Sequence, residues 1–238
     1  MYRQPQGNLI RSRHLFALVA LTLLFLTSQT AFADEVAVWN FNDSDLIVDH
    51  GSGLLTTNFN PANLIFTLGG TTTNARFGDS AGQSLTLQGG TGNANNGRNL
   101  TFSVSTIGLS NINFSFATQG TASGFNSNQV QYSVDGVTFV NFGAPYVPPS
   151  AFGSSPFVFD LSGISGLNNN PNATFRIVFN GATSSSGNNR IDNVVVEGQT
   201  AIAAIPEPSS VVLLGLGMMG TLAGRPILRK KRIRRLRQ

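Results

Sequence analysis

The sequence predicts an all-β domain in which two antiparallel sheets pack as a sandwich. Short runs of alternating apolar and polar residues recur along residues 34–198, and loops rich in Gly, Asn and Ser separate them. No run keeps helical periodicity over roughly ten residues, so helix is expected only as a turn near residues 162–168. Short strands with one apolar face and frequent turn signals are typical of a β-sandwich.

The expected strands follow from this alternation. They are Val36–Phe41, Leu100–Val104, Ile112–Phe116, Val130–Val134, Phe157–Leu161, Phe175–Phe179 and Val194–Val196. Asp135-Gly136 follows one of these runs and precedes Val137 and Phe139. Because Asp-Gly between alternating apolar runs favours a two-residue turn, a tight hairpin is expected there.

Composition and charge exclude several classes of function. The 238 residues contain no cysteine, which excludes disulfides, zinc–thiolate sites and cysteine nucleophiles. Residues 34–204 hold four arginines against ten acidic residues, whereas the basic residues cluster at the two ends of the chain. A nucleic-acid partner is therefore not expected, because such a domain needs its basic residues on the folded surface.

The first 33 residues have the pattern of a secretory signal peptide. A basic stretch at residues 11–14 precedes the apolar run Leu15–Leu26, and Ala31 and Ala33 form an A-x-A cleavage site before Asp34. The Sec translocon is the partner that such a signal implies. The alternative is an uncleaved anchor, which the shortness of the apolar run disfavours.

The C-terminus has three parts, which follow a linker at residues 199–205. Pro206, Glu207 and Pro208 come first, residues 209–224 carry no charge, and residues 225–238 are strongly basic. A helix over residues 209–224 would be about 24 Å long and could span a membrane with help from flanking residues. The basic tail orients such a helix with its C-terminus in the cytoplasm. The orienting residues are Arg225, Arg229, Lys230, Lys231 and Arg232. The alternative, a nucleic-acid patch, is disfavoured by the adjacent apolar segment.

These three parts, in this order, resemble the PEP-CTERM sorting signal of Gram-negative bacteria. The resemblance implies that residues 206–238 hold the protein in the inner membrane until an exosortase processes it near Pro206-Glu207-Pro208. It also implies a destination at the cell surface or in the extracellular, exopolysaccharide-rich matrix of a biofilm.

Three segments of the middle domain resemble a jelly-roll-like extracellular domain that is common among PEP-CTERM cargo. They are Val38–Asn42, Phe159–Ser162 and Arg190–Val194. The resemblance implies an antiparallel jelly-roll-like β-sandwich over residues 34–198, in which the first and last strands can be neighbours. It implies no catalytic residues.

One metal site is considered in this domain. Asp43 and Asp45 follow the first strand and Asp192 begins the last, so neighbouring end strands would bring their oxygens together. Calcium takes six to eight such oxygen ligands, and a structural Ca²⁺ is the only cofactor that the sequence indicates. The alternative is that these aspartates shape turns through bonds to the backbone.

Catalysis and sugar binding are the remaining questions. Paired carboxylates could hydrolyse glycosides, and the candidates are Asp79, Asp135, Asp160, Asp192 and Glu197, but none of them lies in a recognisable catalytic motif. Trp39, Tyr132 and Tyr146 could stack on sugars, although Trp39 has apolar neighbours and is expected in the core. We therefore expect a non-catalytic structural or adhesive protein of an exopolysaccharide matrix. The alternative is a carbohydrate-binding module or a carbohydrate-active enzyme of the cell surface.

Overall fold

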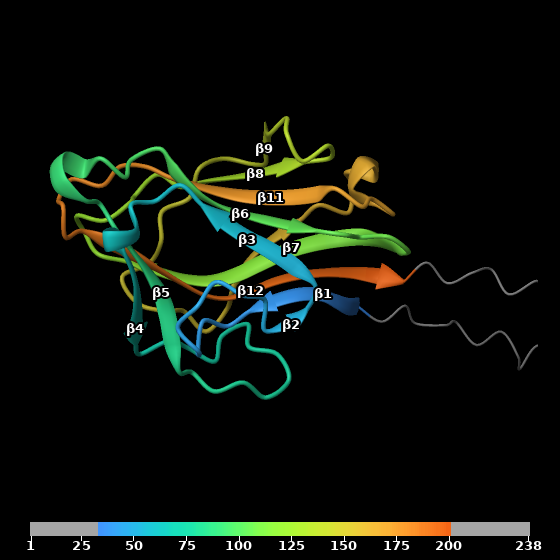
Figure 1. Ribbon diagram of the computed structural model, residues 1–238, viewed down its shortest axis with the longest axis horizontal. Coiled ribbons are helices and arrows are strands. Elements are labelled where there is room, and N and C mark those ends of the chain that lie inside the picture. Colours follow the sequence, from blue (N-terminus) through green and yellow to red (C-terminus); the bar gives the residue numbers. More distant parts are fainter. Residues whose placement is uncertain (1–32, 201–238) are drawn as a thin grey trace, which may run out of the picture. The chain divides into compact units, whose positions relative to one another are not determined.

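The computed structural model describes residues 33–200, which form two antiparallel β-sheets packed face to face (Figure 1). Sheet A has seven strands: β1 (Ala33–Trp39), β2 (His50–Gly51), β4 (Leu64–Leu68), β5 (Gln83–Gln88), β7 (Leu109–Gly120), β10 (Phe157–Asp160) and β12 (Asn188–Thr200). Sheet B has five: β3 (Gly53–Thr57), β6 (Arg98–Val104), β8 (Gln129–Ser133), β9 (Val140–Asn141) and β11 (Ala173–Phe179). The all-β sandwich is confirmed.

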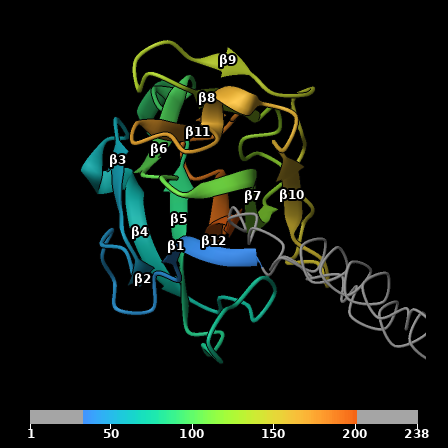
Figure 2. The same ribbon diagram turned by 90° about the vertical axis from the view of Figure 1, so that its right-hand side faces the viewer.

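Strand β12 organises sheet A. Residues 188–191 pair with β5 and residues 194–199 pair with β1, while β7 runs along the other edge of β12. The first and last strands are therefore neighbours, with Trp39 opposite Val194. In sheet B the strand order is β3-β6-β11-β8-β9. A turned view places β8, β9 and β11 in the upper layer and β1, β2 and β12 in the lower one (Figure 2).

The core between the sheets is rich in aromatic rings. Phe114 of β7 stacks on Phe175 of β11 with ring centroids 5.3 Å apart, so this pair joins the two sheets. Trp39 is 0% exposed and meets Phe102 edge-on at 5.1 Å. Because successive side chains of a strand point to opposite faces, the alternating Phe residues all reach this one core. The expected burial of Trp39 is confirmed.

The hairpin after β8 differs from the sequence-based prediction. β8 and β9 do pair, with Tyr132 opposite Val140, but the strands are joined by residues 134–139. Asp135 explains the longer loop, because its carboxylate accepts hydrogen bonds from the backbone N–H of Val137 (2.8 Å) and Thr138 (2.7 Å). These bonds draw both residues away from the ladder, and a two-residue Asp-Gly turn does not form.

Other connections contain single turns of 3-10 helix. These are η2 (Pro61–Asn63), η3 (Thr91–Asn93) and η4 (Ser165–Leu167), and η4 lies within the expected turn at residues 162–168. Across residues 33–200, none of the helices is long and apolar enough to cross a membrane. Residues 1–32 and the predicted membrane helix at 209–224, with its basic tail, lie outside the described residues.

Candidate functional site

The outer face of sheet A is covered by the loop between β4 and β5, residues 69–82. Asn193 of β12 fixes the loop, since its Nδ2 donates to the carbonyl oxygens of Thr71 (2.6 Å) and Thr73 (3.0 Å). Asn74 of the loop binds the sheet in turn, because its Nδ2 donates to the Asn193 carbonyl (2.7 Å) and to the Ser115 hydroxyl (3.0 Å). Polar residues of β7 and β12 are thereby buried and partnered on this face.

Ion pairs also attach the same loop to sheet A. Arg76 lies between two carboxylates, with Nε 3.3 Å from Glu35 of β1 and Nη2 3.1 Å from Glu197 of β12. These three residues join the loop to both end strands of the domain. Glu197, one of the carboxylates that could serve in hydrolysis, is thus engaged in a structural contact.

Two of the three calcium candidates, Asp45 and Asp192, accept hydrogen bonds from backbone N–H groups. Asp192 is 1% exposed, and its two carboxylate oxygens accept hydrogen bonds from the N–H of Thr71 (2.7 Å) and Asn193 (2.9 Å). Burial raises the pKa of Asp192 to about 7. Asp45 accepts from the N–H of Ile47 (2.7 Å), and Asp43 is exposed on the same β1–β2 loop.

Within residues 33–200, no three or more His, Cys, Asp or Glu side chains are grouped so that they could hold a metal ion. The contact of Asp45 with Ile47 is the turn-forming kind that the alternative interpretation expects, whereas Asp192 lies within β12 and binds the backbone of Thr71, 121 positions away. A calcium ion at Asp43, Asp45 and Asp192 stays a prediction that a binding measurement has to test.

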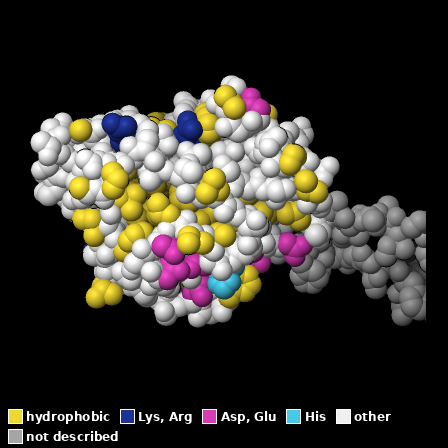
Figure 3. Space-filling model, in the orientation of Figure 1, with side chains coloured by type: hydrophobic (Ala, Val, Ile, Leu, Met, Phe, Trp, Pro, Cys, Tyr) yellow, Lys and Arg dark blue, Asp and Glu magenta, His cyan; other side chains and the backbone are white. Residues whose placement is uncertain are grey.

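Acidic side chains gather around the β1–β2 loop. Asp49 accepts a hydrogen bond from the N–H of Asn40 (2.7 Å), and Asp79 accepts from Asn40 Nδ2 (2.9 Å) and lies 3.4 Å from His50 Nε2. Burial raises the pKa of Asp49, and the charges of neighbouring aspartates add to the shift. On the face drawn in Figure 3, acidic side chains lie beside the histidine in the lower part, and basic side chains are visible in the upper part.

Sheet B presents two rows of mostly polar side chains on its outer face. Alternate residues of β6 and β11, such as Phe102 and Phe175, point into the core, so their neighbours point outward. The register places one outward residue from each strand side by side. The first row is Thr56, Thr101, Arg176, Gln131 and Asn141, and the second row is Leu54, Ser103, Thr174 and Ser133. We call these nine residues the sheet B outer face; Thr101, Ser133 and Thr174 are buried in it, and the other six are partly or fully exposed.

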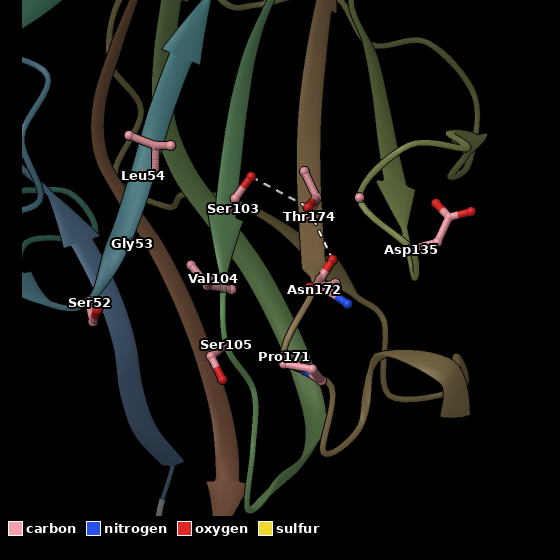
Figure 4. Close-up of a pocket in the computed structure, with 11 residues that line it drawn as sticks. Ser52, Gly53, Leu54, Ser103, Val104, Ser105, Asp135, Pro171, Asn172 and Thr174 are labelled. Atoms are coloured by element: carbon pink, nitrogen blue, oxygen red, sulfur yellow. Dashed lines mark hydrogen bonds between the residues drawn. The ribbon is translucent and has the colours of Figure 1, made fainter.

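A groove of about 510 Å³ continues the second row at the end of the sheet. Ser103 and Thr174 line its floor, Leu54 lies on one side and Asp135 on the other (Figure 4). Thr174 Oγ1 donates to the carbonyl oxygen of Asn172 at 3.2 Å and lies 3.5 Å from Ser103 Oγ. The remaining lining residues are Ser52, Gly53, Val104, Ser105, Gly136, Pro171 and Asn172. Hydroxyl, amide and backbone groups therefore dominate the groove.

Asp135 is committed to its own loop. Hydrogen bonds from the backbone N–H of Thr138 and Val137 and from the Ser133 hydroxyl hold the pKa of its carboxyl well below the usual range. A carboxyl group with a lowered pKa is a poor proton donor near neutral pH. Asp135 is also the only acidic residue among those that line the groove. The pair of carboxylates that glycoside hydrolysis uses is therefore not assembled in this groove.

Arg176 lies at the centre of the sheet B outer face. Its guanidinium carbon is 3.3 Å from the centroid of the Phe139 ring, and its Nε donates to Thr101 Oγ1 at 3.0 Å. Partial burial lowers the pKa of Arg176, but an arginine remains charged at neutral pH. The stacking ring and the Thr101 hydroxyl together fix the position of the guanidinium group.

The aromatic residues considered as sugar platforms face the core. Tyr132 packs partly buried against it, and Tyr146 packs between Phe116 and Phe157 with its hydroxyl buried. The burial of Tyr146 raises its pKa. The outward Ser and Thr residues of β6 and β11 were not among the predicted site residues, although the alternation in Asn99–Val104 and Thr174–Phe179 already marks them.

Comparisons with solved structures find low-identity matches to β-sandwich domains. The CBM22-1 xylan-binding domain from Paenibacillus barcinonensis Xyn10C is 10% identical, with 72% of this chain and 97% of that chain covered and a TM-score of 0.42. The family 29 carbohydrate-binding module CBM29_1 from Piromyces equi is 11% identical, with 71% of this chain and 92% of that chain covered and a TM-score of 0.39. The K3 adhesin domain of Lys-gingipain from Porphyromonas gingivalis is 14% identical, with 70% of this chain and 99% of that chain covered and a TM-score of 0.41. These similarities concern the fold alone.

A family model provides the more specific match. Residues 204–230 match the model described as the PEP-CTERM protein-sorting motif, and this range contains Pro206, Glu207 and Pro208. No curated protein matches the chain. A sorting motif of this kind implies export, anchoring in the membrane and processing by an exosortase. The chain therefore carries a PEP-CTERM protein-sorting motif downstream of an all-β sandwich.

Proposed function

We propose that this protein is a non-catalytic adhesive component of the cell-surface matrix, and that it binds exopolysaccharide through the sheet B outer face. The observation that carries the proposal is the pair of cross-strand rows, the second of which ends in the groove floored by Ser103 and Thr174. The PEP-CTERM motif supports a surface destination, because it directs exported proteins to an exosortase.

The residue types on this face suit a hydrated carbohydrate. Thr, Ser, Asn and Gln side chains each provide hydrogen-bond donors and acceptors, which match the hydroxyl groups of a sugar. Neighbouring strands lie about 4.8 Å apart, so a row offers regularly spaced contacts to an extended polymer. Repeated weak contacts of this kind give adhesion through many sites along one chain.

The same face favours binding over hydrolysis. Asp135 is the one carboxylate that lines the groove, and its bonds to Val137 and Thr138 keep it ionised. Asp160, another carboxylate considered for catalysis, accepts a hydrogen bond from the N–H of Ser162 (2.9 Å) at the end of β10. Both contacts are typical of turns.

After export, the sandwich would lie outside the inner membrane while the basic tail stays in the cytoplasm. Processing near Pro206-Glu207-Pro208 would then release it to the surface. Replacement of these three residues by alanine should leave an unprocessed, membrane-retained form in a host with the exosortase. Identical processing of the variant and the parent would contradict this part of the proposal.

Affinity electrophoresis tests the binding proposal. The full chain, purified in mild detergent, is run through gels that contain the exopolysaccharide of the producing organism. Ser103→Trp should abolish retardation because a bulky side chain fills the groove, while Thr72→Trp on the exposed loop of sheet A should leave retardation unchanged. Loss in both variants, or in neither, would contradict a binding site on sheet B.

A further inference from the structure

We infer that the ligand of the sheet B outer face is an acidic polysaccharide, and that Arg176 binds a sugar carboxylate there. This inference rests on the proposed function and specifies its ligand. Three observations support it: the division of charge between the two sheets, the fixed position of Arg176, and the aromatic residues of this face.

Charge divides unequally between the sheets. Of the ten acidic residues between residues 34 and 200, nine lie on strands of sheet A or on the loops at their ends. They are Asp34, Glu35, Asp43, Asp45, Asp49, Asp79, Asp160, Asp192 and Glu197. Sheet B and the β8–β9 loop carry Arg98, Arg176 and only Asp135. An acidic polymer is therefore repelled by the sheet A side and can approach the sheet B side.

Arg176 is held in place for an anion. The Phe139 ring covers one face of the guanidinium group, with its centroid 3.3 Å from the guanidinium carbon, and Nε donates a hydrogen bond to Thr101 Oγ1. Among the described residues, no carboxylate pairs with Arg176, in contrast to Arg76 between Glu35 and Glu197. A planar guanidinium with free N–H groups matches the two oxygens of a carboxylate.

The aromatic residues of the face also favour a charged ligand. Neutral sugars commonly gain affinity by stacking on an exposed ring. Along the two rows and the β8–β9 loop, the only aromatic side chain that faces outward is Phe139, whose ring is stacked with Arg176. Binding on this face therefore has to come from hydrogen bonds and from the charge of Arg176.

The test compares one polymer with and without its carboxyl groups. The producing organism's exopolysaccharide is used directly and after carbodiimide–borohydride reduction, which converts carboxyl groups to alcohols and leaves the backbone intact. The full chain in mild detergent should bind the untreated polymer about 10-fold or more tightly than the reduced one. Added salt should weaken only the binding to the untreated polymer. Equal binding to both polymers would overturn the inference.

Two arginine variants locate the charge contact. Arg176→Gln should bind the untreated polymer as weakly as the parent binds the reduced one, a loss of about 10-fold or more. Arg190→Gln removes the same charge from sheet A, where Arg190 donates to the Leu68 and Gly69 carbonyls, and should bind like the parent. Equal losses in the two variants would overturn the assignment to Arg176.

The outcomes separate this inference from the proposed function. If the parent binds both polymers equally and Ser103→Trp abolishes both interactions, the sheet B site stands and the acidic ligand is wrong. If the parent binds neither polymer, the proposed function is wrong as well. The comparison of the two polymers needs no variant, so it remains decisive even where Arg176→Gln fails to fold.

Discussion

Sheets A and B both carry polar side chains on their outer faces, but the chain uses the two sets differently. On sheet A, residues 69–82 lie across the face, and Asn193, Asn74 and Asp192 hydrogen-bond to or across that loop. On sheet B, a groove remains above Ser103 and Thr174, and Arg176 has no carboxylate partner among the described residues.

This difference separates polar residues that stabilise the fold from those that are available to a ligand. A buried amide or carboxylate that loses its partner costs about 1–3 kcal/mol, so the polar residues of sheet A hold the loop in place. A polar residue that faces solvent costs little to replace. Stability measurements should therefore respond to changes on sheet A, and binding measurements to changes at the exposed residues of sheet B.

The largest effect on stability is expected at Asn193. Asn193→Ala removes two hydrogen bonds to the carbonyls of Thr71 and Thr73, and it places alanine at a φ of 46°, which alanine disfavours. We expect a loss of about 2–4 kcal/mol in the free energy of unfolding, measured by urea denaturation of the full chain. A change below about 0.5 kcal/mol would show that the loop does not depend on this residue.

The calcium hypothesis predicts the next largest effect. An ion that joins Asp43, Asp45 and Asp192 would stabilise the fold by about 2.7 kcal/mol at 100 times its dissociation constant. Chelation should then lower the Tm by roughly 5–11 °C, and Asp192→Asn should abolish the difference. Coincident melting curves in millimolar calcium and in chelator would favour the turn interpretation.

The pH dependence of stability probes the burial of Asp192. With chelator present, the pKa of about 7 in the folded state lies above the unfolded value of 3.8, so the folded state binds more protons between these values. Stability should fall as the pH rises from 5 to 7 and then level off, by an amount on the order of 2 kcal/mol. Asp192→Asn should remove this fall in urea midpoints at pH 5 and 8. If the stability of the parent protein rises with pH over this range, the raised pKa of Asp192 is contradicted.

The smallest effect on stability is expected on sheet B. Asn141 is exposed on the edge strand β9 and accepts one hydrogen bond from Gln131 Nε2 at 2.9 Å. Asn141→Ala should change the free energy of unfolding by no more than about 0.5 kcal/mol in the same urea assay. A loss as large as that of Asn193→Ala would remove the distinction between the two faces.

The sequence predicted strands best where large apolar residues alternate. The runs around Phe102, Phe114 and Phe175 are all strands, because alternate phenylalanines point into one core. Strand β5 was missed although Leu85 and Leu87 alternate with Ser84 and Thr86, and all four side chains are buried. Strand β2 is only His50–Gly51, which is too short to show a pattern.

The candidate site was less predictable because it depends on contacts between distant residues. Thr71 and Asp192 are 121 positions apart, and nothing in the local sequence shows that the β4–β5 loop covers sheet A. The outward residues Thr101 and Ser103 could be identified from alternation alone. Their alignment with Arg176 and Thr174 could not, because it depends on the register between β6 and β11.

Hydroxyl-radical footprinting tests the central claim most directly, because it locates the polysaccharide on the full chain. Leu54 (61% exposed) and Val137 (81%) lie at or beside the groove of sheet B, while Phe77 (64%) and Leu68 (78%) are equally accessible on the sheet A side. We predict that bound exopolysaccharide lowers the oxidation of Leu54 and Val137 and leaves that of Phe77 and Leu68 unchanged. Protection of Phe77 and Leu68, with Leu54 and Val137 still oxidised, would contradict the assignment of the binding face to sheet B.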